Sequence, residues 1–272
     1  MTNDQWLEFC RAAVEDLRGV FASMPTRVER EPVIGTGVGG DETTEVDAAA
    51  EDAIVARLER LHMEEGLDFH LVSEELGERT YGRSPTLRVV VDPIDGSLNA
   101  KRNIPFFSVS IAIAEGSTMR DVFLGFVHDF GSGEEWTATK GGGAWLNGER
   151  LGAIPPKDEI EILALEATVA ASVADKAEAL AGFGRRLRIM GSLALSLCNL
   201  AAGRVDAVCS LREARAVDIA AAQLILGEVG LPIMFVDAAP FEAGPLDTVP
   251  RSPVAAAGTV ELCERLAYIV AT

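Results

Sequence analysis

Apolar residues in the first part of the chain recur at three- and four-residue steps, which is the spacing of an amphipathic helix. Residues 3–22 predict one such helix, and residues 45–63 predict a second, with Thr44 placed to cap it. Between the two, residues 34–44 contain four glycines. This composition predicts a loop or a hairpin.

The middle of the chain changes to short apolar or alternating runs separated by turn residues, a pattern typical of β-strands. Together these runs predict an antiparallel sheet. They lie at 70–73, 87–91, 106–114, 121–129 and 134–139, and a tight turn with a hairpin follows at 140–151.

The last part of the chain alternates strands and helices, which predicts a layered α/β unit. The predicted strands lie at 161–167, 186–190, 205–210 and 232–236, and the predicted helices at 173–182, 193–202, 217–229 and 258–270. Prolines and charges at 155–159 mark the boundary. We therefore expect an N-terminal half at 1–155 and a C-terminal half at 156–272, within one compact unit of a size that 272 residues allow.

The net charge and the positions of the cysteines and histidines disfavour several classes of protein. The net charge of -18 disfavours nucleic acid and anionic membranes as partners, although it is equally explained by solubility or a salty cytoplasm. The chain has no run of about 18 apolar residues and no secretory signal, so we expect no membrane span. The four cysteines form no CxxC pair and the three histidines no HExxH pair. This predicts reduced, mostly buried thiols in a cytoplasmic protein and argues against a zinc site.

The segment VVVDPIDGSLN, residues 89–99, is the strongest candidate for chemistry. A predicted strand delivers Asp92 and Asp95 around a proline turn, Gly96 permits close backbone approach, and Ser97 adds a hydroxyl. Carboxylate and carbonyl oxygens are the ligands that Mg²⁺ prefers. Asp-x-x-Asp-Gly is also a common surface turn, but two carboxylates at one strand tip repel each other unless a cation neutralises them.

Other acidic residues occupy comparable positions. Glu74 and Glu75 follow a predicted strand, whereas Asp47 and Asp218 open predicted helices. Each has an ordinary alternative: a solvated loop for the glutamates and a favourable interaction with the helix dipole for the aspartates. One hypothesis unites them, in which acids from strand ends and helix starts converge on two or three metal ions.

Five ordered motifs together resemble the inositol monophosphatase family, and the resemblance runs almost end to end. It is closest to the archaeal branch, whose members often act on both inositol monophosphates and fructose 1,6-bisphosphate. The motifs are GGDETTEVDAAAED (39–52), SEEL (73–76), DPIDGS (92–97) with the following IPFFSVSIAIAEG, GGGAWLNG (141–148), and MGSLALSLCNLAAGRVDA (190–207) with VDIAA (217–221). The resemblance implies an α+β fold, a layered α-β-α-β-α sandwich with a mainly antiparallel first sheet and a mixed second layer.

The resemblance also implies residue roles. Two or three Mg²⁺ ions per subunit would be held by Glu74, Asp92, the carbonyl of Ile94, Asp95 and Asp218, with Asp47 and Glu75 assisting a further, weaker ion. Substrate would contact Asp95, Gly96, Ser97, Arg188, Leu193 and Arg212, with Arg215 as a helper behind them. For the two substrate arginines, a surface salt bridge is the ordinary alternative. A homodimer and inhibition by lithium are likewise implied.

Two departures from the family pattern change what is expected: the first bears on metal affinity and on the order of the loop, and the second on substrate preference. Glu45 stands where the family commonly has a lysine beside the threonine of the first motif, and the stretch from Arg212 to Asp218 is shorter than usual.

The function expected is hydrolysis of a phosphate monoester of inositol or a sugar by metal-activated water, with Glu74, Asp95 and Ser97 as catalytic residues. Two alternatives stay open. A phosphatase of 3′-phosphoadenosine nucleotides would need an apolar or aromatic slot for the base, for which the sequence offers no specific candidate. A silent phosphosugar-binding relative would usually lack one of the principal acids, and this chain keeps them all.

Overall fold

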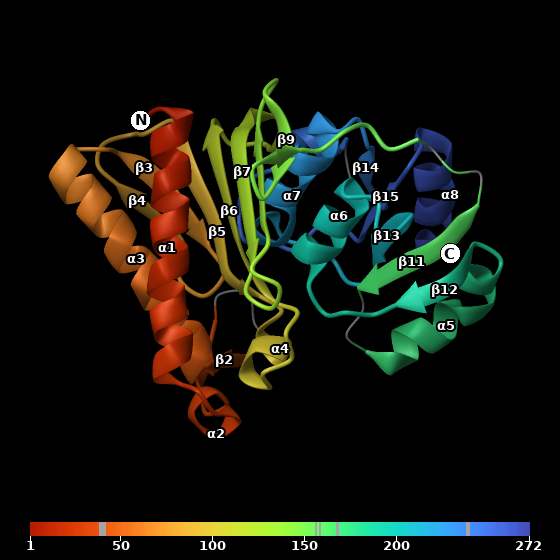
Figure 1. Ribbon diagram of the computed structural model, residues 1–272, viewed down its shortest axis with the longest axis horizontal. Helices are drawn as coiled ribbons and strands as arrows, with labels where there is room; N and C mark the ends of the chain where they lie inside the picture. The colour runs from red at the N-terminus through yellow and green to blue at the C-terminus, as the bar shows by residue number, and fades with distance from the viewer. Residues whose placement is uncertain (38–41, 156, 158, 167–168, 238–239) are drawn as a thin grey trace.

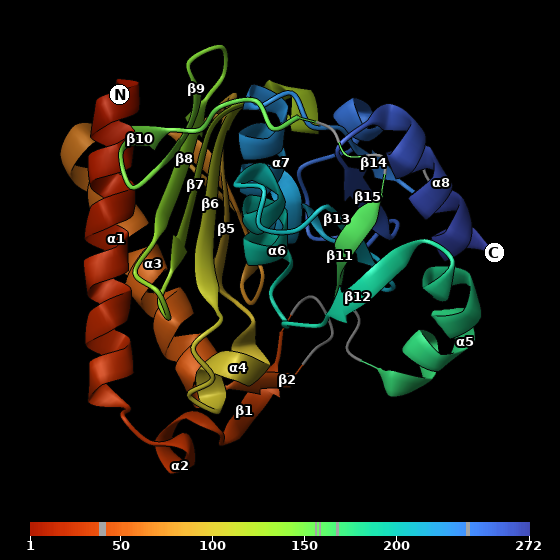
Figure 2. The same cartoon turned by 45° about the vertical axis from the view of Figure 1, so that its right-hand side comes forward.

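The computed structural model describes residues 1–37, 42–155, 157, 159–166, 169–237 and 240–272. In this part of the chain, helices and sheets alternate in five layers (Figures 1 and 2). The outer helices on one side are α1 (Asn3–Ser23) and α3 (Glu45–Glu65), the central pair is α6 (Leu193–Ala201) and α7 (Ala216–Glu228), and the far pair is α5 (Ala170–Ala181) and α8 (Val260–Ala271). This arrangement confirms the predicted α-β-α-β-α sandwich.

The larger sheet separates the outer helices from the central pair. Its eight strands are β3 (Phe69–Ser73), β4 (Gly77–Tyr81), β5 (Leu87–Asp95), β6 (Ser108–Glu115), β7 (Val122–Asp129), β8 (Glu135–Thr139), β9 (Gly143–Leu146) and β10 (Glu149–Arg150), in the order β10-β9-β8-β7-β6-β5-β3-β4. Neighbours are antiparallel except β3 and β5, which run parallel. The predicted antiparallel sheet is therefore confirmed for most pairs. Strand β4 was not predicted, because its sequence GERTY is largely polar and its three central residues are exposed.

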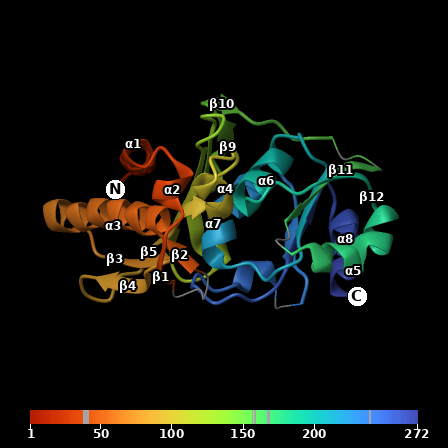
Figure 3. The ribbon, with the colours of Figure 1, turned by 90° about the horizontal axis from the view of Figure 1, so that it is seen from below.

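The smaller sheet lies between the central and far helices, as the view from below shows (Figure 3). Its strands are β11 (Ile160–Glu166), β12 (Gly184–Arg188), β13 (Ala207–Ser210), β14 (Ile233–Phe235) and β15 (Val254–Ala257). The order is β12-β11-β13-β15-β14. Strands β12, β11 and β13 run parallel, and β15 pairs antiparallel with both of its neighbours, β13 and β14. The predicted mixed layer is thus confirmed, although β15, the short run VAAA, was not predicted.

Short elements complete the frame beside the large sheet. They are α2 (Arg27–Arg30), β1 (Val33–Thr36), β2 (Glu42–Thr44) and α4 (Ser97–Lys101). Strands β1 and β2 pair antiparallel, which agrees with the hairpin alternative of the loop or hairpin expected at 34–44, while residues 38–41 of that segment lie outside the described residues. Thr44 begins α3 as predicted.

Three hydrophobic clusters fill the spaces between layers, and strand pleating decides which residue enters which cluster. Val89 and Val91 of β5 belong to the cluster beneath α1 and α3, whereas Val90 belongs to the cluster around α6 and α7. Leu71 and Val72 of β3 divide in the same way. Because successive side chains on a strand point to opposite faces, this alternation also sets the direction of the polar residues that follow.

Two further observations concern the whole of the described chain. None of its helices combines the length and apolar character that crossing a bilayer requires. All four cysteines, Cys10, Cys198, Cys209 and Cys263, are free and buried, as predicted.

Candidate active site

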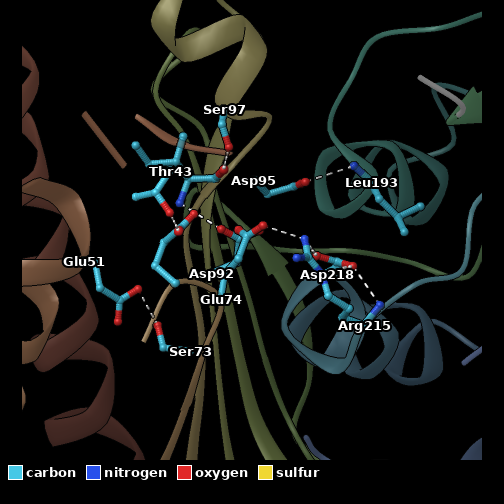
Figure 4. A network of polar contacts seen from close by, with 12 residues as sticks. Thr43, Glu51, Ser73, Glu74, Asp92, Asp95, Ser97, Leu193, Arg215 and Asp218 are labelled. Atoms are coloured by element: carbon cyan, nitrogen blue, oxygen red, sulfur yellow. Dashed lines mark hydrogen bonds and ion pairs between the residues drawn. The ribbon is translucent and has the colours of Figure 1, made fainter. Parts of the chain in front are cut away.

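A cavity of about 810 Å³ opens at one end of the two sheets, where strand ends meet helix starts. Its walls come from the ends of β3 and β5, the first residues of α4, α6 and α7, and the segment after β13. Acidic side chains on the wall include Glu74, Asp92, Asp95 and Asp218, which Figure 4 labels, and also Glu75. The structure therefore brings five of the predicted acidic residues to one cavity, although they come from separate stretches of the chain.

The pleat of β3 explains the direction of the first acidic pair. Val72 faces the α6–α7 cluster, so Glu74, two residues later, points to the same side and reaches the cavity. Ser73 points the opposite way, toward α3, where its hydroxyl donates a 2.7 Å hydrogen bond to the Glu51 carboxylate. Glu51 therefore fastens the end of β3 to α3 directly beside Glu74.

Strand β5 delivers the central acids through an irregularity. Its pairing with β6 shifts between Asp92 and Asp95, where Pro93 lacks the N–H that a regular ladder needs. The backbone N–H of Ile94 donates to Asp92 at 2.9 Å, and Ser97 donates to the Ile94 carbonyl at 3.2 Å. This local turn lets both aspartates line the same cavity.

Gly96 ends the turn in a conformation that side chains rarely adopt. Its φ is 98°, and an added Cβ would lie 3.0 Å from the Gly191 carbonyl oxygen and 3.2 Å from the Phe107 Cβ. Glycine is therefore required here both by its backbone angle and by the close approach of the 191 segment.

Asp95 also holds the start of α6, although the two elements are about a hundred residues apart. Its carboxylate accepts hydrogen bonds from the Ser192 hydroxyl, from the Leu193 N–H at 3.3 Å and from the Ala194 N–H at 2.8 Å. A negative charge at this position satisfies amide groups that a helix start leaves unpaired. The predicted substrate residue Leu193 thus lines the cavity through this contact.

Asp218 lies in the first turn of α7 with Arg215 before it. The Arg215 guanidinium lies 2.6 Å from the Glu74 carboxylate and 3.2 Å from the Asp218 carboxylate, and only 14% of the Arg215 side chain is exposed. The predicted helper Arg215 is therefore a cation inside the acidic cluster, not behind it.

Asp47 has the helix-start role considered for it, whereas its role as a metal ligand stays a prediction. Its Oδ2 accepts hydrogen bonds from the Thr44 N–H at 3.0 Å and from the Thr44 hydroxyl, which caps α3. Its Oδ1 is buried and, among the residues that the structure describes, has no hydrogen-bond partner. One oxygen thus caps the helix, and Asp47 itself is not among the described residues of the cavity wall.

Burial and mutual repulsion raise the pKa values of these carboxyls. Desolvation, with Asp218 repulsion opposed by the Arg215 charge, raises the pKa of Glu74 to about 7. Desolvation raises the pKa of Asp95 to about 7 despite the Ser192 hydrogen bond. The pKa of Asp92 is raised well above its usual value, first by burial and then by the Glu74, Asp95 and Asp218 charges. Such a cluster of raised values is typical of a functional site.

The donor set fits a hard divalent cation. Buried carboxylates that repel one another, a backbone carbonyl at Ile94 and the unpartnered Asp47 Oδ1 are all oxygen donors of the kind that Mg²⁺ prefers. No group of three or more His, Cys, Asp or Glu side chains within the described ranges is already gathered closely enough around one point to hold an ion. Instead, the Arg215 guanidinium lies between two of the acids.

The predicted substrate residues are not all brought together. Gly96, Ser97, Leu193 and Arg212 line the cavity. Arg188 is not among the described residues of the cavity wall; it lies at the end of β12, exposed, with its guanidinium donating to the Leu187 carbonyl at 2.9 Å. The structure therefore does not place Arg188 with the others.

Two residues on the cavity wall, and one beside it, escaped the sequence reasoning. Lys101 ends α4 four residues after Ser97, so the two share one face of that helix and both line the cavity. Glu166 at the end of β11 accepts from the Gly191 N–H at 2.9 Å and from the Ser196 hydroxyl at 2.6 Å. Glu166 and the previously noted Glu51 follow the same pattern as the predicted acids, because each is a buried carboxylate on a strand end or helix.

Comparison with known proteins places this site in a class. The inositol monophosphatase family matches residues 6–270, and the chain belongs to this family of phosphatases. A fructose-1,6-bisphosphatase/inositol-1-monophosphatase of Methanothermobacter thermautotrophicus is 35% identical over 92% of this chain and 94% of its own length. A bifunctional NADP phosphatase/NAD kinase of Methanocaldococcus jannaschii is 30% identical over 73% of this chain and 39% of its own.

Solved structures agree with the family assignment. The MJ0109 gene product, described as an inositol monophosphatase–fructose 1,6-bisphosphatase, superposes with a TM-score of 0.81 at 27% identity, covering 99% of this chain and 100% of that one. A Pyrococcus horikoshii protein with similarities to inositol-1 monophosphatase gives 0.78 at 27% identity, covering 98% of each chain.

Proposed function

We propose that the protein is a magnesium-dependent phosphatase that hydrolyses phosphate monoesters of inositol or sugars, among them inositol 1-phosphate and fructose 1,6-bisphosphate. The observation that carries the proposal is the meeting of Glu74, Asp92, Asp95 and Asp218 in one cavity. The relatives named above, described as acting on these two kinds of substrate, support the choice of substrate class.

The residues divide into cation-holding and anion-holding sets. Glu74, Asp92, the Ile94 carbonyl, Asp95 and Asp218 would hold two ions, with Asp47 and Glu75 serving a third. Bound divalent ions would supply Lewis acidity and lower the pKa of coordinated water. Glu74 and Ser97 orient the attacking water for in-line displacement at phosphorus, and their fixed placement supplies the entropic part of the rate enhancement.

The anion-holding set lines the same cavity as the acids. Gly96 and Ser97 present the backbone of the turn to the phosphate, and Lys101 and Arg212 add positive charge to the same wall. The family commonly has a lysine where this chain has Glu45, and we propose that Lys101 of α4 provides the positive charge in its place. An arginine can grip a second phosphate or a sugar hydroxyl through two parallel hydrogen bonds.

A nucleotide phosphatase is the second candidate, supported by the NADP phosphatase relative. The described wall of the cavity contains no aromatic residue on which an adenine base would stack. The sugar and inositol phosphates therefore rank first. A panel that compares kcat/KM for inositol 1-phosphate, fructose 1,6-bisphosphate and a 3′-phosphoadenosine nucleotide separates these classes.

The substitution Asp95→Asn tests the proposed site. Loss of the carboxylate charge should lower magnesium-dependent phosphate release by at least about 10³-fold, in line with the loss of a principal electrostatic group. Asp206→Asn is a matched control, because Asp206 also accepts hydrogen bonds from one side chain and two backbone N–H groups but lines a different cavity. Full activity of the Asp95→Asn protein would refute the site, and a wild-type protein that releases no phosphate in excess Mg²⁺ would indicate the silent relative.

Cellular setting and assembly belong to the same proposal. Four free, buried thiols fit a reducing compartment, which supports a cytoplasmic enzyme. We further propose a homodimer and inhibition by lithium, which sedimentation and an inhibition series with LiCl against NaCl would test.

A further inference from the structure

Arg215 is surrounded by the carboxylates that the proposed function assigns to metal ions. One guanidinium nitrogen contacts Glu74 at 2.6 Å and Asp218 at 3.2 Å, and the Nε lies 3.4 Å from the second Asp218 oxygen. The Arg215 backbone N–H also donates to Asp218 at 2.8 Å, which fixes the arginine at the start of α7. The guanidinium therefore joins the end of β3 to the start of α7 (Figure 4).

More acidic groups than basic groups surround the Arg215 guanidinium. Burial would lower the pKa of Arg215, but the Asp218, Glu74 and Asp92 carboxylates together raise it. One guanidinium thus faces three carboxyl groups, those of Asp218, Glu74 and Asp92, in a site where little of any partner is exposed. A buried guanidinium in this position reduces the repulsion among the acids, and a divalent ion at the same position would do so more strongly.

We propose that Arg215 is an internal counter-ion that holds Glu74 and Asp218 together in the absence of metal, and that it competes with a divalent ion for these two carboxylates. The inference rests on the proposed metal site and deepens it. It makes Arg215 a positioning residue whose guanidinium sets the affinity of the ion between β3 and α7. A purely structural brace would have the opposite effect on that affinity, because its loss would scatter the ligands.

Metal binding without substrate distinguishes the two roles. Isothermal titration with MgCl₂ at pH 8.5 should show at least roughly tenfold tighter binding to Arg215→Met at the affected site, because one like charge is removed within contact distance. The same variant should show a lower thermal midpoint in EDTA but a midpoint near that of the wild type in saturating Mg²⁺.

Arg57→Met is the matched control, because Arg57 forms a partly buried ion pair with Asp16 at 2.6 Å between α3 and α1, away from the cavity. It should lower both midpoints equally and leave the affinity for Mg²⁺ unchanged. Weaker or unchanged Mg²⁺ binding by Arg215→Met would overturn the counter-ion role. A wild-type protein that binds no Mg²⁺ would instead refute the proposed function, so the two failures are distinguishable.

A measurement on the unaltered chain covers the case in which Arg215→Met does not fold. The Nε–Hε resonance of Arg215, assigned by its absence in Arg215→Lys, should move during a MgCl₂ titration in step with calorimetric saturation. The Arg57 resonance should remain still. An Arg215 resonance that stays unmoved at Mg²⁺ saturation would also overturn the proposal.

Discussion

Raising the pH of the metal-free protein from 5 to 8 should lower its free energy of unfolding. Burial raises the pKa of Glu74 from 4.5 to about 7 and that of Asp95 from 3.8 to about 7. At about 1.4 kcal/mol for each unit, the two units between pH 5 and the folded pKa of about 7 correspond to about 3 kcal/mol for Glu74 and about 3 kcal/mol for Asp95. Either value is a large part of the 5–15 kcal/mol that stabilises a typical domain.

The sign follows from proton linkage. A carboxyl whose pKa is higher in the folded than in the unfolded state binds more protons when folded. Its contribution to stability is fully present below the unfolded value of about 4 and is lost as the pH rises through about 7. His128 acts in the opposite direction, because burial lowers its pKa, but it is a single histidine against several acids.

Urea denaturation in EDTA at closely spaced pH values measures this loss directly. Adding Mg²⁺ at pH 8 should restore stability, by about 2.7 kcal/mol when the ion is at a hundred times its dissociation constant. Asp95→Asn, which cannot ionise at this position, should show a shallower fall in EDTA. Metal-free stability that stays level or increases between pH 5 and 8 would refute the reasoning that these acids are buried together.

Three further substitutions have definite expected outcomes. Lys101→Met should raise KM for fructose 1,6-bisphosphate about tenfold or more with little change in kcat, as expected for the loss of a charge-assisted contact. Arg102→Met, at the exposed neighbouring position, should leave KM unchanged. An equal rise in KM for both variants would contradict the role assigned to Lys101. Gly96→Ala should lower the free energy of unfolding by about 1–3 kcal/mol, measured by thermal unfolding, and should abolish activity, because the φ of 98° at Gly96 disfavours a side chain. Gly19→Ala in α1 is the control: an added Cβ there meets open space, so the change should be neutral or stabilising. Glu51→Gln should stabilise the metal-free protein at pH 8 and not at pH 5, because burial raises the pKa of Glu51 to about 7; an identical effect at both pH values would argue against a charged Glu51.

Much of the layer order follows from local patterns. The long helices at 3–22 and 45–63 were predicted to within two residues of α1 and α3, because their apolar stripes are regular and Thr44 is a clear cap. Strands β4 and β15 were missed for physical reasons. The first is polar at an exposed sheet edge, and the second is rich in alanine, which has little preference for strands outside a packed context.

The site was predictable in its residue types but not in its contacts. Carboxylates at strand ends are visible in the sequence, and the family resemblance related Asp218 to them. The Arg215 bridge and the bond from Asp95 to the start of α6 depend on how distant elements pack, which no local pattern encodes. Arg188 is the opposite case. The family resemblance alone predicted that it contacts substrate, whereas its position at the end of β12 keeps it outside the described cavity wall.

The hydrogen bonds from Asp95 to Ser192 and Ala194 have a consequence for how this family loses activity. The carboxylate that we propose as a metal ligand also joins the end of β5 to the start of α6, so a neutral replacement would weaken this contact between layers together with the proposed metal site. A descendant that abandons catalysis while retaining its shape would therefore need a second change near residue 192, and paired substitutions at these two positions would mark such inactive lineages.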